Sequence, residues 1–380
     1  MIDWKEYRLA SDFLMTYQSN KPQLHLPSKH LVFKVDWKVC EVISFFSGEK
    51  DYENIDISQE LFCTIVDKLS EVGILIKQTE TDMSESIIKE WDDWDESSWY
   101  MHLRTKDPEF EPTEEGRLER VKKFREMEDS PPNYFKCDCK KEKSINLPKA
   151  SKMDNVTLTK AFEARRSCRR FSKDSVTIQE LSDVLFYTGG ILFTNDTHSY
   201  GTVAKKASPS PGARHSIELY ILVNNCDNIT KGIYHYCQKH HTLNLINKVE
   251  NTEDFLNDAL YEQEYFLNSA VTIFYTSIVD RLKWKYKTSR VYRLIHFEVG
   301  HYAQNSLLVA SALGLGSYLT AAFKESVVSN KLSIDGVEEI VMYTTGLGHK
   351  LEDEAPRKDI KVSENIPENM NVSWPIGEHS

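Results

Sequence analysis

A run of alternating cations and large apolar side chains lies immediately before the longest apolar helical pattern of the sequence. Its cations are Arg281, Lys283, Lys285 and Lys287, and they alternate with Leu282, Trp284 and Tyr286. A lysine among aromatic rings and like charges has a lowered pKa, because burial and repulsion both disfavour its charged form. Lys285, with Tyr286 beside it, could then act as a general base. Alternatively, Lys285 stays charged and holds an anionic group in place.

A second group with chemical potential is Arg165-Arg166-Ser167-x-Arg169. Guanidinium groups bind the oxygens of a phosphate monoester bidentately, and a hydroxyl adds a short hydrogen bond. The spacing therefore predicts a phosphate site, with a solvated basic turn as the alternative. The doubled arginine leaves open which of Arg165 and Arg166 reaches the phosphate.

A Pro/Gly/Ser loop precedes a strand that alternates cleanly from residue 216 to 224. The loop contains Ser208, Pro209, Ser210, Gly212 and His215. Loops of this composition allow backbone amides to approach a flat ligand without intervening side chains.

Near the end of the regular part of the chain, Gly346-Leu347-Gly348 follows a strand pattern and Lys350 comes next. Glycines that leave a strand beside a lysine could hold an anion. We therefore predict a turn at residues 346–348, with Lys350 beside it as a candidate ligand for an anion.

The elements that must position these residues can also be predicted. An apolar stripe from Tyr292 to Leu313 indicates a long buried helix, with Ser289 as a candidate N-cap and Gly314 and Gly316 as stop residues. A further helix is expected over 178–190, with its cap among residues 175–177. Strands are expected over 216–224 and 269–279 and before residue 346, and a hairpin over 231–246.

Residues 1–80 predict a small helix-rich domain. The segment has two amphipathic helices, ended by Gly48 and Gly73, and then a short strand at residues 74–76, which is the order of a winged helix. This segment resembles the PqqD-like domains that recognise leader peptides. The second helix carries more acids than bases, which disfavours DNA binding, since phosphates supply most of that affinity. Peptide binding and a purely structural or dimer-forming role both stay open.

Residues 81–150 change in composition to tryptophans among acids and then to a highly charged stretch. We expect a connecting arm with a helix or two that packs on the second domain or on a partner subunit, the alternative being a solvated connector. The second domain is expected over 151–360, and a polar tail over 361–380.

The net charge of −11 disfavours non-specific binding to nucleic acid or to an anionic membrane. The sequence shows no membrane-spanning run and no signal peptide, and its seven sparse cysteines fit a reducing cytoplasm. No metal site is expected, because Cys137-x-Cys139 lacks a second pair. The histidines His235, His240 and His241 are expected at the surface of the hairpin.

These motifs together resemble a known family. The resemblance rests on Lys285-Tyr286, the arginine–serine segment, the Pro/Gly/Ser loop that ends at His215, and Gly314-Leu315-Gly316. They are similar to the signature of the SagB-type azoline dehydrogenases, which belong to the nitroreductase superfamily of flavoproteins. The resemblance implies an α+β fold with a mainly antiparallel sheet flanked by helices, and a long helix buried at a homodimer interface.

The resemblance also implies the cofactor and its contacts. FMN would bind non-covalently, with its phosphate at Arg165 or Arg166, Ser167 and Arg169, and near the 346–348 turn and Lys350. Its ring would lie against the 208–215 loop, where Pro211 and Ala213-Arg214 depart from the family's small residues.

In this family the Lys-Tyr pair is assigned the acid/base role, which maps to Lys285 and Tyr286. The implied reaction is oxidation of thiazolines or oxazolines in a ribosomally made peptide to azoles, in a complex with a cyclodehydratase. Two alternatives stay open: an NAD(P)H-dependent flavin reductase of the same fold acting on another substrate, and a peptide-binding scaffold without flavin.

Overall fold

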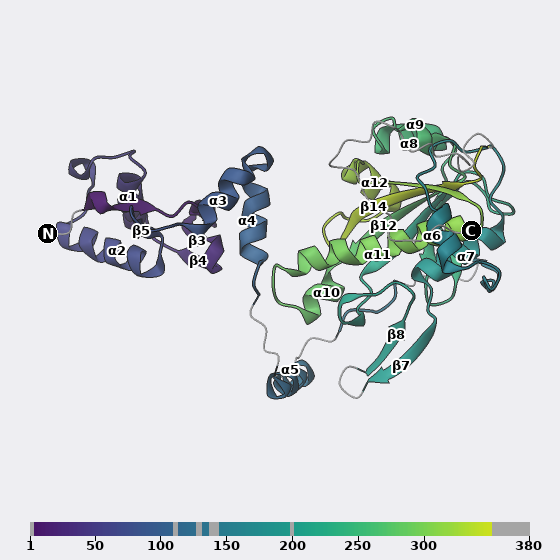
Figure 1. Ribbon diagram of the computed structural model, residues 1–380, viewed down its shortest axis with the longest axis horizontal. Helices are drawn as coiled ribbons and strands as arrows, with labels where there is room; N and C mark the ends of the chain where they lie inside the picture. The colour runs from purple at the N-terminus through teal and green to yellow at the C-terminus, as the bar shows by residue number, and fades with distance from the viewer. Residues whose placement is uncertain (1–3, 109–112, 127–130, 137–143, 198–200, 352–380) are drawn as a thin grey trace, which may run out of the picture. The chain divides into compact units, whose positions relative to one another are not determined.

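The computed structural model describes residues 4–108, 113–126, 131–136, 144–197 and 201–351 (Figure 1). Contacts divide the chain into two units, with the boundary between Arg117 and Leu118. The short segment Thr288–Tyr292 groups with the first unit. The boundary falls inside the predicted connecting arm, so the predicted limits at 80 and 150 stay predictions, and the tail at 361–380 lies outside the described residues.

The first unit combines short strands with helices. Strands β2 (Leu14–Gln18), β3 (Lys21–Leu26) and β4 (Leu31–Lys34) form one antiparallel sheet, and β1 (Tyr7–Leu9) pairs with β5 (Leu75–Lys77). The helices are α1 (Trp37–Phe46), α2 (Gln59–Val72), α3 (Met83–Glu90) and α4 (Asp95–Thr105). A further helix, α5 (Glu114–Glu126), spans the boundary.

The two helices predicted for residues 1–80 form as expected. The Ser58 side chain accepts from the backbone N–H of Leu61 at the start of α2, and Gly73 ends that helix in the left-handed conformation. The helix-rich description was incomplete, because it missed β1 to β4. The β2–β3 turn is a two-residue hairpin in which Ser19 and Asn20 both have positive φ.

Part of the predicted arm packs within the first unit. Trp99 and Leu103 of α4 are buried, Tyr100 bonds the His25 ring at 2.8 Å, and Arg104 donates to the carbonyl of His30 at 2.7 Å. Helix α4 therefore belongs to the first unit's own fold, rather than being an arm that packs only elsewhere.

The second unit is built on a seven-stranded antiparallel sheet with the order β13-β14-β12-β9-β10-β11-β6. Its strands are β6 (Ser144–Asn146), β9 (Ile217–Val223), β10 (Gly232–Cys237), β11 (Thr242–Asn247), β12 (Val271–Ile278), β13 (Gly316–Thr320) and β14 (Glu339–Gly348). A separate hairpin, β7 (Phe193–Thr197) and β8 (Gly201–Lys205), projects from the unit (Figure 1).

Helices cover both faces of this sheet (Figure 1). One core cluster joins the sheet to α7 (Ile178–Gly189) and α11 (Val291–Ala312), and the other joins its opposite face to α8 (Thr252–Ala259), α9 (Glu264–Leu267) and α12 (Glu325–Leu332). Of the remaining helices, α6 (Leu158–Ala164) directly precedes the arginine–serine segment, and α10 (Val279–Lys285) ends at Lys285 shortly before α11 begins.

Local signals account for the ends of the main helices. Thr177 and Glu180 form a complete capping box at the start of α7, as the predicted cap at 175–177 requires. Gly314 follows α11 with φ +79°, which confirms it as the stop residue. The expected strands and the hairpin at residues 231–246 also form.

Two local predictions for the second unit were wrong. Residues 346–348 are not a turn, because they lie inside β14 and pair with β12 and β13. The hairpin histidines are not all at the surface, because His235 is 4% exposed and its Nε2 lies 2.8 Å from a carboxylate oxygen of Glu218.

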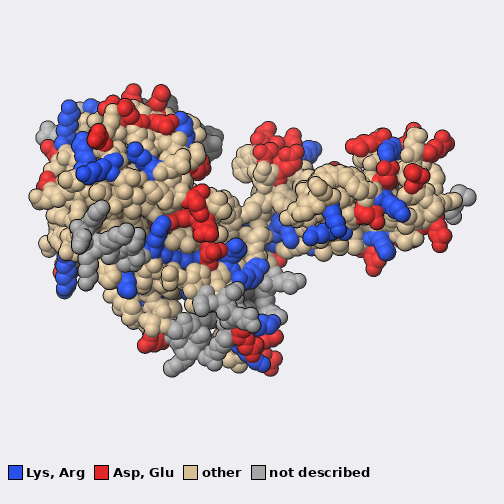
Figure 2. Space-filling view, turned by 180° about the vertical axis from the view of Figure 1, so that it is seen from behind, with Lys and Arg blue, Asp and Glu red and all other residues tan. Residues whose placement is uncertain are grey.

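Basic and acidic side chains are interspersed on the face of each unit that is visible in Figure 2. Within the described ranges, no helix is long and apolar enough to cross a membrane. The described part of the chain also has no group of three or more potential metal ligands. Cys137 and Cys139 fall outside it.

Candidate active site

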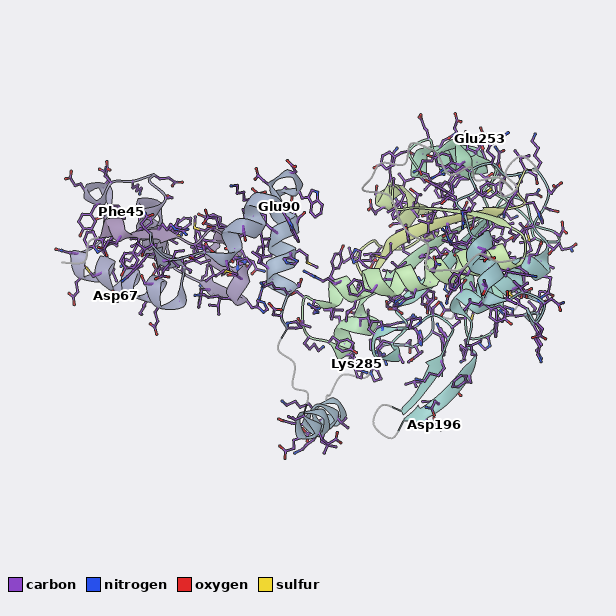
Figure 3. All side chains as sticks on the ribbon, viewed as in Figure 1. Phe45, Asp67, Glu90, Asp196, Glu253 and Lys285 are labelled. Atoms are coloured by element: carbon purple, nitrogen blue, oxygen red, sulfur yellow. The ribbon has the colours of Figure 1, made fainter. Side chains whose placement is uncertain are left out.

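The predicted catalytic pair lies against the predicted ring-binding loop. Lys285 ends α10 and its Nζ donates to the carbonyl of Gly212 at 3.3 Å. A Cβ on Gly212 would lie 2.6 Å from both the Lys285 Nζ and the Tyr286 hydroxyl. Two segments more than seventy residues apart in sequence therefore bring the Lys285 ammonium, the Tyr286 hydroxyl and the Gly212 backbone together. Figure 3 labels Lys285.

The pKa of Lys285 is lowered, first by burial and then by the charge of Arg214. The direction matches the sequence prediction, but the source of repulsion does not. The charge of Arg281, which was expected to contribute, is instead paired with Glu218, with 2.6 Å between Nη1 and Oε1. A lysine with a lowered pKa holds a larger neutral fraction and is a better base near neutral pH.

The 208–215 loop is tightly fixed. The buried Ser208 hydroxyl donates to the carbonyl of Thr188 at 2.7 Å and accepts from the side-chain amide of Asn305 at 2.8 Å. His301 Nδ1 lies 3.2 Å from the carbonyl of Pro209, and the Ser210 hydroxyl accepts from the backbone N–H of His215 at 2.7 Å. Helix α11 thus supports the first half of the loop.

The second half of the loop has unusual backbone geometry. Gly212, Ala213 and His215 have φ values of 59°, 53° and 46°. Left-handed conformations in residues with a Cβ cost energy and persist only where surrounding contacts enforce them. Ala213 and His215 therefore hold this strain close to Gly212, the residue whose carbonyl accepts from Lys285.

His215 is buried and neutral. Its Nε2 donates to the carbonyl of Ala204 at 3.0 Å, which leaves Nδ1 to accept from the Tyr302 hydroxyl at 3.3 Å. Burial, followed by the charge of Lys206, lowers the pKa of His215 to about 3. His215 therefore fixes the end of the loop rather than exchanging protons near neutral pH.

A buried polar network below the loop was missed by the sequence reasoning. Glu298 of α11 accepts from the backbone N–H and hydroxyl of Ser216 at 3.1 and 2.7 Å, and burial raises its pKa. Lys206 Nζ lies 3.4 Å from the Tyr302 hydroxyl, and burial lowers the pKa of Lys206 to about 7. These residues are isolated polar positions in otherwise ordinary segments, so their spacing gave no signal.

The predicted phosphate residues come together elsewhere. Ser167 pairs with Ser317 of β13, and the backbone N–H of Cys168 donates to the carbonyl of Ser317 at 2.9 Å. Phe171 pairs with Lys350, so Lys350 lies close to the arginine–serine segment. The misassigned glycines 346–348 still belong to this region, because Gly348 pairs with Gly316.

The composition of this group fits a phosphate. Arg166, Ser167 and Arg169 are exposed, and Arg165 and Lys350 are half-buried, so a cluster of donors faces solvent at the sheet end. A Cβ on Gly316 would lie 2.6 Å from Cys168 Sγ, which shows how closely the segment approaches β13. Arg169 also stacks on Tyr318, with 4.8 Å from Cζ to the ring centroid.

The two groups of candidate residues lie at opposite ends of α11 (Figure 1). Lys285 precedes the helix and the phosphate cluster surrounds Gly316 beyond its end. Twenty residues of helix, Arg293 to Ala312, span about 30 Å at 1.5 Å per residue. The predicted catalytic pair and the predicted phosphate cluster therefore lie beyond opposite ends of this helix.

Comparison with known proteins gives matches over the second unit. Residues 162–349 match the Nitroreductase family. The nitroreductase-type protein MJ1384 of Methanocaldococcus jannaschii is 29% identical over 208 residues, which are 55% of this chain and 97% of that protein. The family match covers the arginine–serine segment, the loop and the Lys-Tyr pair, and it ends one residue before Lys350.

Two further relatives are named for peptide processing. The trifolitoxin-processing protein TfxB of Rhizobium leguminosarum bv. trifolii is 29% identical over 240 residues, covering 59% of this chain and 61% of TfxB. The microcin B17-processing protein McbC of Escherichia coli is 26% identical over 135 residues, covering 34% of this chain and 49% of McbC. The chain thus spans less than two thirds of the length of either.

Proposed function

The chain carries a nitroreductase-family domain over residues 162–349, as its motifs predicted, and on that premise we propose that it is an FMN-dependent dehydrogenase. Its substrate would be a thiazoline or oxazoline ring in a ribosomally made peptide, and its product the aromatic azole. The observation that carries the proposal is the convergence of Lys285 and Tyr286 on Gly212. The names of TfxB and McbC support a peptide substrate.

The residues have separate roles in this proposal. Lys285, with its lowered pKa, accepts the acidic proton from the azoline carbon next to the carbonyl. The Tyr286 hydroxyl, at the same glycine, orients the ring and exchanges a proton with Lys285. Bound FMN supplies the acceptor for the hydride lost from the neighbouring ring carbon. The neutral His215 and the bonds to Ser208 hold the loop against which the flavin ring would lie.

The proposed FMN phosphate site is the cluster of Arg165, Arg166, Ser167, Arg169 and Lys350. Guanidinium and ammonium groups beside a hydroxyl bind a dianion strongly. The position of the two groups beyond opposite ends of α11, a helix of about 30 Å, supports a homodimer in which one subunit binds the phosphate and its partner supplies the Lys-Tyr pair.

The substrate chemistry also defines a partner. An azoline forms when a cysteine, serine or threonine side chain attacks the preceding carbonyl and water is lost, so a cyclodehydratase must act first. We propose that the chain works in a complex with such an enzyme in the cytoplasm. The first unit would then bind the leader segment of the precursor peptide.

The test uses the purified full chain. A yellow protein that releases FMN and lowers the mass of a thiazoline peptide by two hydrogens is the expected result. In the double variant Lys285→Ala/Tyr286→Phe, turnover should be lost while FMN stays bound. Loss of flavin from that variant would instead assign Lys285 to cofactor binding.

The competing function is an NAD(P)H-dependent flavin reductase, which the match along 97% of MJ1384 favours. Rapid NAD(P)H oxidation without azole formation would establish it. A colourless protein that does not take up added FMN would overturn both flavin functions.

A further inference from the structure

Two buried arginines connect the loop and helix α10 reciprocally. Arg214, in the loop, donates from Nε to the carbonyl of Arg281 at 3.2 Å. Arg281, in α10, donates from Nη1 to the carbonyl of His215 at 2.9 Å. Arg214 is 8% exposed and Arg281 is 1% exposed. Each segment therefore satisfies a backbone acceptor of the other with a buried charged donor.

Both arginines also bind a third segment, residues 131–136, which we call the strap. Arg214 Nη2 donates to the carbonyl of Pro132 at 3.3 Å, and Arg281 Nε donates to the carbonyl of Asn133 at 3.0 Å. The hydroxyl of Tyr134 donates to the carbonyl of Ala213. The carbonyls of the neighbouring residues Pro132 and Asn133 thus accept from Arg214 of the loop and Arg281 of α10.

Aromatic stacking completes the arrangement. The guanidinium of Arg214 lies 5.3 Å from the ring centroid of Tyr134 in the strap and 4.9 Å from that of Trp284 in α10. Trp284 is the residue directly before Lys285. A planar guanidinium can stack on rings while its edges donate hydrogen bonds, and a lysine ammonium cannot do both.

We propose that Arg214, Arg281 and the strap form a clasp that positions Lys285 and Tyr286 against Gly212, with Arg214 as the positioning residue. The proposal rests on the proposed function for the role of Lys285. At the Arg214 position the sequence departs from the small residue common in the family it resembles. The clasp accounts for that departure, because a small side chain could not connect all three segments.

The clasp has two separable effects on Lys285. The bonds and stacking fix its position, whereas the charge of Arg214 disfavours its protonated form. Arg214→Lys keeps the positive charge but loses the planar guanidinium group, and with it the hydrogen bonds to two segments and the stacking on the rings. Arg214→Gln loses the charge as well. Lys283→Gln is the matched control, since Lys283 is an exposed cation on the same helix that takes no part in the clasp.

Two readouts do not depend on catalysis. Hydrogen exchange of residues 211–215 reports on the loop, where the backbone N–H groups of Ala213, Arg214 and His215 are all bonded. The pH dependence of amine labelling at Lys285, followed by mass spectrometry, reports its protonation. Azole formation is measured in parallel.

In Arg214→Lys we expect exchange in the loop and the strap to be about tenfold faster and turnover to fall about 10- to 100-fold, while the labelling midpoint stays in place. In Arg214→Gln the midpoint of Lys285 labelling should also move to higher pH, because the repelling charge of Arg214 is gone. If Arg214→Lys does not fold, Tyr134→Phe removes only the hydroxyl that binds Ala213, and faster loop exchange is expected there too.

Hydrogen exchange of the loop and the strap in Arg214→Lys that matches Lys283→Gln would overturn the clasp, whatever the turnover. Absence of azole formation in the wild type would overturn the proposed function and leave the clasp to be judged by exchange and labelling. The two failures are therefore distinguishable.

Discussion

The substitution Gly212→Ala tests the geometry of the catalytic pair most directly. An added Cβ would lie 2.6 Å from both the Lys285 Nζ and the Tyr286 hydroxyl, whereas ordinary contact begins at 3.4 Å. Each group must therefore retreat by about 0.8 Å, and a displacement near 1 Å costs up to about 100-fold in rate. Because φ is +59° at this position, alanine also costs about 1–2 kcal/mol of stability.

The control is Gly314→Ala, which carries the same backbone penalty without the clash. Gly314 has φ +79° and nothing lies within 4 Å of its added Cβ. Thermal unfolding and azole formation are measured for both variants. Both should lose similar stability, while turnover should fall about 10- to 100-fold only in Gly212→Ala. Equal turnover in the two variants would refute the placement of Lys285 and Tyr286 at the reacting ring.

Three further outcomes follow from the structure. Gly316→Ala places a Cβ 2.6 Å from Cys168 Sγ, so the FMN content of the purified protein should fall. The free energy of unfolding measured in urea should also fall, by about 1–3 kcal/mol. Glu218→Gln leaves the buried charge of Arg281 without its carboxylate, and the urea midpoint should drop by the equivalent of about 3–5 kcal/mol. His215 has a pKa of about 3 when folded and about 6.5 when unfolded, so the unfolded chain binds the extra proton. Stability should therefore decline as the pH falls from about 6.5 toward 3, and His215→Gln should flatten that slope.

Local chemistry made much of the fold predictable. The Thr177–Glu180 capping box and the left-handed glycines Gly73 and Gly314 depend on residues close in sequence, so their types and spacing are sufficient evidence. The RxSxR segment and Lys350 could be assigned to one site only through the resemblance. Their actual contact comes from the pairing of Phe171 with Lys350, nearly 180 residues away.

The failed predictions depend on pairing that a single segment cannot reveal. Gly346 to Gly348 look like a turn by composition, but pairing on both sides keeps them in a strand. His235 carries a polar side chain in an alternating hairpin, which indicates a surface position. Its burial follows from Glu218 on the neighbouring strand, which supplies the carboxylate that makes a buried imidazole tolerable.

The clasp illustrates which sequence signal remains when the interacting residues lie far apart in the chain. Pro132, Arg214 and Arg281 lie in three distant parts of the chain, and nothing near any of them indicates the other two. Arg214 was visible only as an unexpected large cation in a loop where small residues are expected to admit a ligand. Because a buried arginine requires acceptors, its presence implied that backbone carbonyls would be found nearby, and the structure supplies them at Arg281 and Pro132. A departure from a family pattern is therefore informative when the departing side chain has donors that must be satisfied.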